Sequence, residues 1–297
     1  QIAASADDGS AVDTLSELQA LVTQAASEAI AAALIRVQAY AGNASQAFGD
    51  TPPLLNDYLL LGITGLDADN LLSVQSALET TAVQSASLAS ASDVQVLVNA
   101  FNRILAEANG SATDDTPGQH ATVANYNAIG ATTAGGLNTP GLALLNDVVA
   151  NLSIAEVNTV PKVEALAATV SHLQALAHLA VPPTPLPNIE LSALGALGIT
   201  GLNADNLPVF LALVASTADD TTGIDTLEKL QSLVTQAQQD HAQILLAQQR
   251  QQAAIALIQA YAGDETTAAG SAPPTLADFV TAGVTGVTVN NLAAIQS

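Results

Sequence analysis

Three polar residues stand together where the chain could bind a cation: Asp67, Asp69 and Asn70 follow the phrase Gly62-Ile-Thr-Gly-Leu. Hard cations such as Ca²⁺ take carboxylate and amide oxygens as ligands, so this cluster could form a calcium site. The cluster lacks the ligand spacing and the terminal glutamate of an EF-hand loop. Asp and Asn are also the residues that cap backbone N–H groups where a helix begins. The pattern favours capping, with calcium binding as the alternative.

The other reactive residue types are not spaced for catalysis. His172 and His178 are six residues apart, which is not the i, i+4 spacing of a helical metal pair. No serine stands in a Gly-x-Ser-x-Gly elbow, and no glycine-rich loop leads into Gly-Lys-Ser/Thr. Three pairs of adjacent acids are typical of solvated turns: Asp7-Asp8, Asp114-Asp115 and Asp219-Asp220. We therefore expect no enzyme activity, no metal site and no cofactor.

The composition excludes several classes of partner. The chain has 297 residues, 27 of them acidic and five basic, for a net charge of −22. Such a chain repels nucleic acid and anionic membrane surfaces. No run of 18 apolar residues occurs, so we expect no membrane insertion of this segment. Cysteine is absent, which removes disulfides and thiolate metal sites, and the absence of the oxidisable Cys and Met suits an extracellular location.

The phrase at 62–70 repeats along the chain. It returns at 198–206 as Gly-Ile-Thr-Gly-Leu-Asn-Ala-Asp-Asn, at 283–291 as Gly-Val-Thr-Gly-Val-Thr-Val-Asn-Asn, and more weakly at 130–138. A fixed internal period predicts stacked supersecondary units, and arrays of such units build length or surface. We predict four repeats, at 14–89, 90–158, 159–225 and 226–297. Residues 1–13 read as the end of a preceding repeat. They would continue the incomplete third helix of 226–297 in the next copy of a longer array.

Each repeat is expected to hold three helices. The first begins after a hydroxyl cap residue, Thr14 in the first repeat, where Glu17 completes a capping box. Its equivalents are Ser90, Thr159 and Thr226. The second helix is short and is closed by a glycine: Gly62, Gly130, Gly198 or Gly283. Four residues before each glycine stands an apolar anchor, which we predict to be buried: Tyr58, Tyr126, Leu194 or Phe279. A third helix follows, such as 71–78. The fold class is all-α, a tandem array of bundles or a solenoid.

The first helix varies in length between repeats. In the fourth repeat it is expected to run over about 226–262, roughly 55 Å at 1.5 Å per residue. Its middle is glutamine-rich and includes Leu245, Leu246, Gln248 and Gln249. We expect these side chains to contact a neighbouring repeat unit or chain, with a merely solvated helix as the alternative.

Several stretches resemble the helical repeats of giant type I-secreted bacterial surface adhesins, of the RTX-like and Bap-like kind. They are Ile104-Leu-Ala-Glu-Ala-Asn-Gly-Ser111, Tyr126-Asn-Ala-Ile-Gly-Ala-Thr-Thr133, Leu142-Ala-Leu-Leu-Asn-Asp147, Glu156-Val-Asn-Thr159 and Ala277-Asp-Phe-Val-Thr-Ala-Gly-Val-Thr-Gly-Val287. The resemblance extends over nearly the whole chain and consists of repeat phrasing without catalytic residues. It implies an extracellular stalk or fibre on a bacterial surface, serving adhesion or biofilm formation. The glycine-rich calcium nonapeptides of such proteins are absent, so calcium dependence is not implied.

Two functions from different classes follow. The first is a non-enzymatic structural segment of a cell-surface filament or adhesin stalk. Its partners would be copies of itself, in tandem or end to end, with lateral association through the long first helices. The alternative is a set of three-helix modules that bind host or matrix proteins, because the second and third helices are faintly similar to albumin-binding modules.

Overall fold

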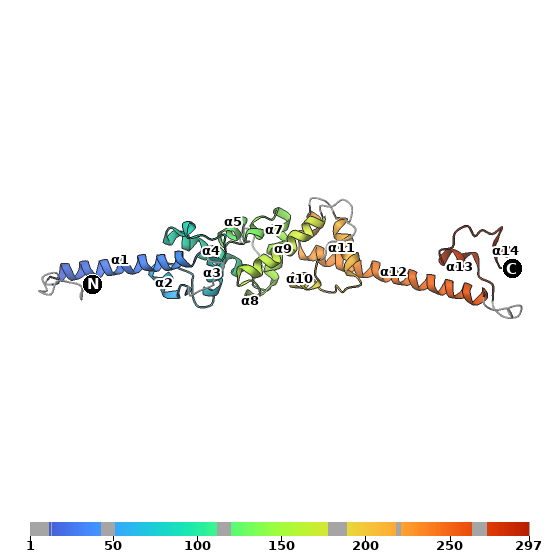
Figure 1. Ribbon diagram of the computed structural model, residues 1–297, viewed down its shortest axis with the longest axis horizontal. Helices are drawn as coiled ribbons and strands as arrows, with labels where there is room; N and C mark the ends of the chain where they lie inside the picture. The colour runs from blue at the N-terminus through green and yellow to red at the C-terminus, as the bar shows by residue number, and fades with distance from the viewer. Residues whose placement is uncertain are drawn as a thin grey trace. The chain divides into compact units, whose positions relative to one another are not determined.

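The computed structural model describes residues 12, 14–42, 51–111, 120–177, 189–217, 221–262 and 272–296. Over these residues the regular secondary structure is helical, with one isolated bridge between Asn109 and Ser153 (Figure 1). The chain is all-α, as the sequence predicts. Segment 1–11, His178, Gly263 and the three pairs of adjacent acids lie outside the described residues.

The chain divides into two compact units, and each is described by itself. The first comprises residues 1–200 and 214–231, and the second comprises residues 201–213 and 232–297. The elements of the first unit are α1 (Leu15–Tyr40), α2 (Leu55–Leu60), α3 (Leu71–Leu78), η2 (Ser85–Leu88), α4 (Ala91–Glu107), α5 (Val123–Ala128), α6 (Thr132–Gly135), α7 (Thr139–Asn151), α8 (Ile154–Val157), α9 (Val160–Ala177), α10 (Leu191–Ala196) and η3 (Thr222–Ile224).

Side-chain caps set where the first helices of the repeats begin. The Thr14 hydroxyl accepts the Glu17 N–H at 3.3 Å, and the Glu17 carboxylate accepts the Thr14 N–H at 2.9 Å. Ser90 and Asp93 form the same reciprocal pair at the start of α4. Each pair satisfies two backbone donors that the helix itself leaves open. Past the other end of these helices, Gly42 and Gly110 take left-handed φ values of 78° and 81°.

Helix α9 forms the centre of the first unit. Its buried residues recur at three- and four-residue steps, and contacts reach it from α3, α6, α7, α8 and α10. The buried set includes Val163, Leu166, Val170 and Leu173. A helix apolar on several sides belongs inside a bundle, where its neighbours cover each face.

Short helices beyond three per repeat are the main departure from the expected pattern. Helix α6 occupies the weak copy of the repeated phrase, where Thr133 replaces the second glycine of the phrase. Without a glycine there the chain continues in right-handed turns, because left-handed backbone is costly for a residue with a side chain. Helix α8 and the 3₁₀ segments η2 and η3 fill connections that the periodicity does not mark.

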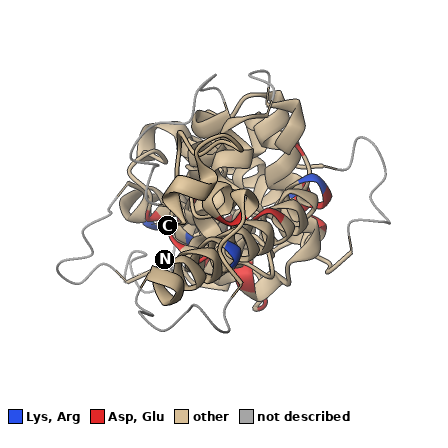
Figure 2. Ribbon diagram, turned by 90° about the vertical axis from the view of Figure 1, so that its right-hand side faces the viewer, with Lys and Arg blue, Asp and Glu red and all other residues tan. Residues whose placement is uncertain are grey.

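The second unit contains most of α11 (Leu207–Ala215) and of α12 (Leu227–Ala262), together with α13 (Leu276–Thr281) and α14 (Leu292–Ile295). Helix α12 has 36 residues, close to the predicted length. Among the described residues of the second unit, the largest buried apolar side chains are Phe210 on α11 and Phe279 on α13. Most of the described residues are neither acidic nor basic, as the tan ribbon of Figure 2 shows.

Candidate functional site

The repeated phrase is a helix-ending turn with the same backbone bonds in every copy. We call it the marker turn, at 62–70, 130–138, 198–206 and 283–291. The N–H of Ile63 donates to the Tyr58 carbonyl and that of Gly62 to the Leu59 carbonyl, both at 3.0 Å. The same two bonds recur at Gly130, Gly198 and Gly283, with N···O distances from 2.9 to 3.2 Å. This pair of bonds defines a Schellman motif, which needs a left-handed residue at the glycine position. All four glycines have φ between 73° and 86°.

An asparagine braces three of the four marker turns from within. The Asn70 Oδ1 accepts the Asp67 N–H at 2.8 Å, and its Nδ2 donates to the Gly65 carbonyl at 2.8 Å. Asn206 and Asn291 make the corresponding bonds. Asn70 therefore does not cap α3 with its side chain, contrary to the capping expectation. In the divergent second copy, Asn138 does cap the next helix, accepting the Gly141 N–H at 2.9 Å.

The acidic residues of the first marker turn stabilise the loop itself. One Asp67 oxygen accepts the N–H groups of Asp69 and Asn70, at 2.9 and 3.3 Å. Within the described part of the chain, no group of three or more His, Cys, Asp or Glu residues is placed to hold a metal ion. The contacts made by Asp67 are those of a self-contained Asx turn.

A side chain from the next repeat pairs with the marker turn through its backbone. The Gln95 Oε1 accepts the Thr64 N–H at 2.8 Å, and the Gln95 Nε2 donates to the Thr64 carbonyl at 2.9 Å. Gln231 pairs with Thr200 in the same way, at 3.1 and 2.9 Å. We call this two-bond contact the glutamine clamp. At the remaining junction Glu164 accepts the Thr133 N–H at 2.9 Å, a single bond to the residue after the position of Thr64 and Thr200.

A second donor reinforces the clamp at two junctions. Asn102 Nδ2 donates to the Gly65 carbonyl at 2.6 Å, and Gln238 Nε2 donates to the Gly201 carbonyl at 2.8 Å. Neither the clamp glutamines nor these second donors were identified from the sequence. For the glutamines a signal exists in the sequence. A glutamine stands five residues after each of three helix caps: Gln19 after Thr14, Gln95 after Ser90 and Gln231 after Thr226.

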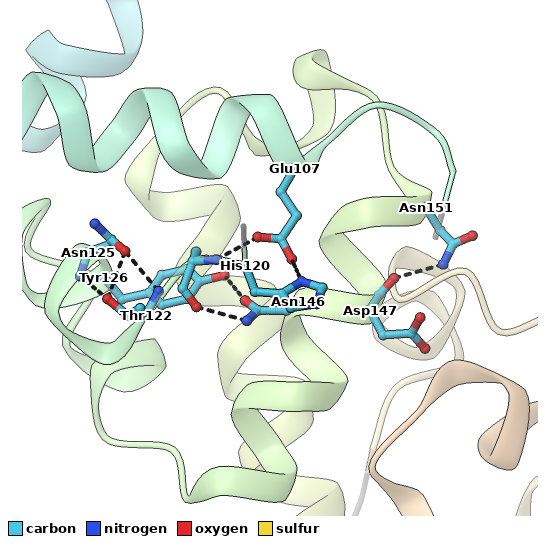
Figure 3. A network of polar contacts seen from close by, with 9 residues as sticks. Glu107, His120, Thr122, Asn125, Tyr126, Asn146, Asp147 and Asn151 are labelled. Carbon is cyan, nitrogen blue, oxygen red and sulfur yellow. Dashed lines mark hydrogen bonds and ion pairs between the residues drawn. The ribbon is translucent and has the colours of Figure 1, made fainter. Parts of the chain in front are cut away.

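A buried polar network links three elements of the second repeat (Figure 3). The Glu107 side chain is 2% exposed, and its two oxygens contact His120 Nδ1 at 2.8 Å and the Ala121 N–H at 2.7 Å. Asn146 accepts the Tyr126 hydroxyl at 2.8 Å and donates to the Ala121 carbonyl at 2.8 Å. Burial, with the nearby Glu107 charge, raises the pKa of Tyr126, so its hydroxyl remains a donor. Both Glu107 oxygens are engaged, and the network ties α4, α5 and α7 together.

The first repeat uses an ion pair in the corresponding region. Arg36 Nε donates to Asp57 Oδ1 at 2.8 Å, and the Leu54 N–H donates to Asp57 Oδ2 at 2.8 Å. Burial raises the pKa of Asp57, but the bonds from Arg36 and Leu54 outweigh it and leave the pKa below the usual value of 3.8. Tyr58 is fully buried, yet its hydroxyl has no hydrogen-bond partner among the residues that the structure describes.

The anchor residues and the self-association candidates lie in opposite environments. Tyr58, Tyr126 and Leu194 are fully buried, and Phe279 is 7% exposed. Leu245 and Leu246 on α12 are exposed, and Gln248 and Gln249 are exposed beside them. His172 is exposed on α9, outside the Glu107 network.

Helix α1 is long and apolar enough, by length and composition, to cross a membrane. The search of the sequence for 18 consecutive apolar residues did not find this helix, because its apolar residues alternate with Gln, Ser and Thr. Only 6% of its apolar window is buried, and one such helix is weak evidence of a span, since signal sequences and the core helices of soluble proteins pass the same test. No family model matches the chain, and neither the curated proteins nor the solved structures provide a match.

Proposed function

We propose that the chain is a non-enzymatic structural segment of an extracellular bacterial surface filament or adhesin stalk. The observation that carries the proposal is the reuse of one joint: a marker turn, held by its backbone from the first helix of the following repeat. Gln95 and Gln231 make this contact with the same atoms. A contact used at the first and third junctions, with a one-bond contact from Glu164 at the second, serves to propagate an array, as in other repeat proteins.

The charge and composition support the same proposal. A chain with net charge −22 and no cysteine or methionine is soluble at high local density and resists oxidation outside the cell. The polar groups of the marker turns and of the Glu107 network are engaged in holding helix ends. Such groups position the backbone of a scaffold.

Antibody labelling of intact cells tests the proposal. We expect antibody raised against this chain to label filaments outside unpermeabilised cells in electron microscopy. Removing residues 90–158, one whole repeat, should shorten the labelled filament. Label confined to permeabilised cells, or an unchanged filament length, would contradict the proposed role.

Lateral association through α12 is a separate part of the proposal. Leu245 and Leu246 are 44% and 39% exposed on the longest helix, so they are available to a neighbouring filament. Leu245→Gln combined with Leu246→Gln should reduce the bundling of filaments without altering their length. Ile35→Gln, at another exposed apolar position, is the matched control. Equal bundling in both variants would refute the lateral contact.

A further inference from the structure

The beginning of α1 duplicates the beginning of α12 in sequence but not in burial. Residues 14–25 and 226–237 are identical at nine of twelve positions. Leu230 and Val234 are fully buried, whereas the equivalent Leu18 and Val22 are 37% and 61% exposed. Nearly the same helical sequence is thus buried against the chain at 226–237 and exposed at 14–25. Its apolar face at 15–22 is an unfilled copy of an internal surface.

The last marker turn is uncovered in the complementary way. Ile63 and Val74 of the first repeat are 5% and 0% exposed. Their equivalents in the fourth repeat, Val284 and Ile295, are 45% and 46% exposed. In the first repeat the following helix α4 packs on α3 and clamps Thr64. The fourth marker turn has the same backbone form, with Gly283 and Gly286 at φ 86° and 83°, so the Thr285 peptide group is held in the same conformation as that of Thr64; Gln251 of α12 donates to the neighbouring Ala282 carbonyl at 3.3 Å.

The polar partners of the clamp are present on both uncovered faces. Gln19 stands where Gln95 and Gln231 stand, five residues after the helix cap. Thr285 stands where Thr64 and Thr200 stand, between the two glycines of the turn. The capping box of Thr14 and Glu17 fixes the start of α1, which sets the position of Gln19 on the helix.

Charge favours a second copy as the occupant of these faces. The chain carries 27 acidic residues, yet segments 18–27 and 279–297 contain no charged residue, and the flanking Glu17 and Asp278 carboxylates are held in capping boxes. Two strongly acidic molecules repel each other, and uncharged contact faces keep that repulsion away from the interface. The reinforcing donor is missing, because Ala26 stands where Asn102 and Gln238 stand. The contact between copies is therefore weaker than the internal junctions and reversible.

We infer that the first half of α1 of one copy packs on α13 and α14 of a second copy, end to end. The Thr285 N–H donates to the Gln19 Oε1 of the other copy, and the Gln19 Nε2 donates to the Thr285 carbonyl. Leu18 and Val22 cover Val284 and Ile295. This inference rests on the proposed array function, but an array joined only covalently would survive its failure.

Two single-face variants test the inference in the full chain. The variant Leu18→Asp with Val22→Asp loses the α1 face, and Val284→Asp with Ile295→Asp loses the opposite face. The wild type should form open-ended oligomers that grow with concentration in sedimentation velocity. Each variant alone should be monomeric, and their mixture should form a dimer and nothing larger, because one intact pair of faces remains. A monomeric wild type, or oligomers that persist in both variants, would overturn the inference.

Control variants separate this interface from other causes. Leu72→Asp with Val96→Asp adds the same two charges at exposed apolar sites elsewhere and should assemble like the wild type. Gln19→Leu removes both clamp bonds and should weaken association about ten-fold. Gln19→Glu keeps an accepting oxygen, of the kind that Glu164 offers to Thr133, so its association should be weaker than that of the wild type and stronger than that of Gln19→Leu. Circular dichroism should show unchanged helix content in every variant. Co-sedimentation of the wild type with neutral phosphatidylcholine vesicles, abolished by Leu18→Asp with Val22→Asp, would instead assign the α1 face to lipid.

Discussion

Replacing Gly62 with alanine should lower the free energy of unfolding by about 1–2 kcal/mol, the cost of left-handed backbone for a residue with a Cβ. The structure isolates this cost at Gly62, because φ is +73° and a Cβ added there would meet no atom within 4 Å. The Schellman bonds of the marker turn require that conformation. The loss is therefore one of backbone strain, without a steric contribution.

Two further glycines give the matched comparisons. At Gly130, with φ +79°, an added Cβ would lie 2.1 Å from Thr80 Oγ1 and 2.9 Å from Thr80 Cβ. Gly130→Ala should therefore cost about 1–3 kcal/mol more than Gly62→Ala, because the backbone of Thr80 must shift. Gly195 lies inside α10 with an ordinary φ and open space around it. Gly195→Ala should stabilise the protein by about 0.5–1 kcal/mol.

Urea unfolding followed by circular dichroism at 222 nm measures all three variants. Gly62, Gly130 and Gly195 belong to the same compact unit, so they report on one transition. The expected order of stability is Gly195→Ala, wild type, Gly62→Ala and Gly130→Ala. A Gly62→Ala variant as stable as the wild type would refute the requirement for left-handed backbone at the marker glycine.

Three other predictions concern the polar groups. Tyr126→Phe should cost about 1–2 kcal/mol in urea unfolding because it leaves a buried Asn146 oxygen without its donor, whereas Tyr58→Phe should be neutral or stabilising because that hydroxyl has no partner; equal effects would contradict both assignments. The lowered pKa of Asp57 means that its charge stabilises the fold at pH values above 3.8, and that this contribution is lost as the pH falls through the lowered folded pKa. The difference in unfolding free energy between wild type and Asp57→Asn should therefore close on acidification. A difference that stays constant with pH would refute this assignment. Gln95→Leu should cost about 1–3 kcal/mol at pH 7, since both bonds to the Thr64 peptide group are lost; an unchanged urea midpoint would show that the clamp contributes nothing to stability.

The sequence predicted the elements whose ends carry local chemical signals. Helix α3 spans Leu71–Leu78 as expected, and α12 ends at Ala262 as expected. Thr14 supplies its cap through neighbouring atoms only, so a short stretch of sequence contains the information.

Features that depend on distant partners were not predictable in the same way. Asn70 has the chemistry of a cap and braces its own turn through atoms within five residues, as Asn291 does, but its further contact with Asn102, 32 residues away, has no local signal. The glutamine clamp joins residues 31 apart, which helical periodicity does not pair. The exposed start of α1 also looks like core in sequence, because amphipathic spacing identifies a face without identifying what covers it.

The glutamine clamp joins neighbouring repeats through the backbone of the marker turn. Gln95 and Gln231 pair with a peptide group, which every residue other than proline offers, and the threonine hydroxyls of Thr64 and Thr200 add only longer contacts, at 3.4 and 3.5 Å. The marker turns at 62–70 and 198–206 can therefore drift in sequence while the glutamine still fits, and the repeats that follow them can exchange places at these two junctions. Recombination between such repeats would yield working chains of new length without a compensating mutation at the joint. In the filament that we propose, length would then be a trait that gene duplication and loss adjust in whole repeats.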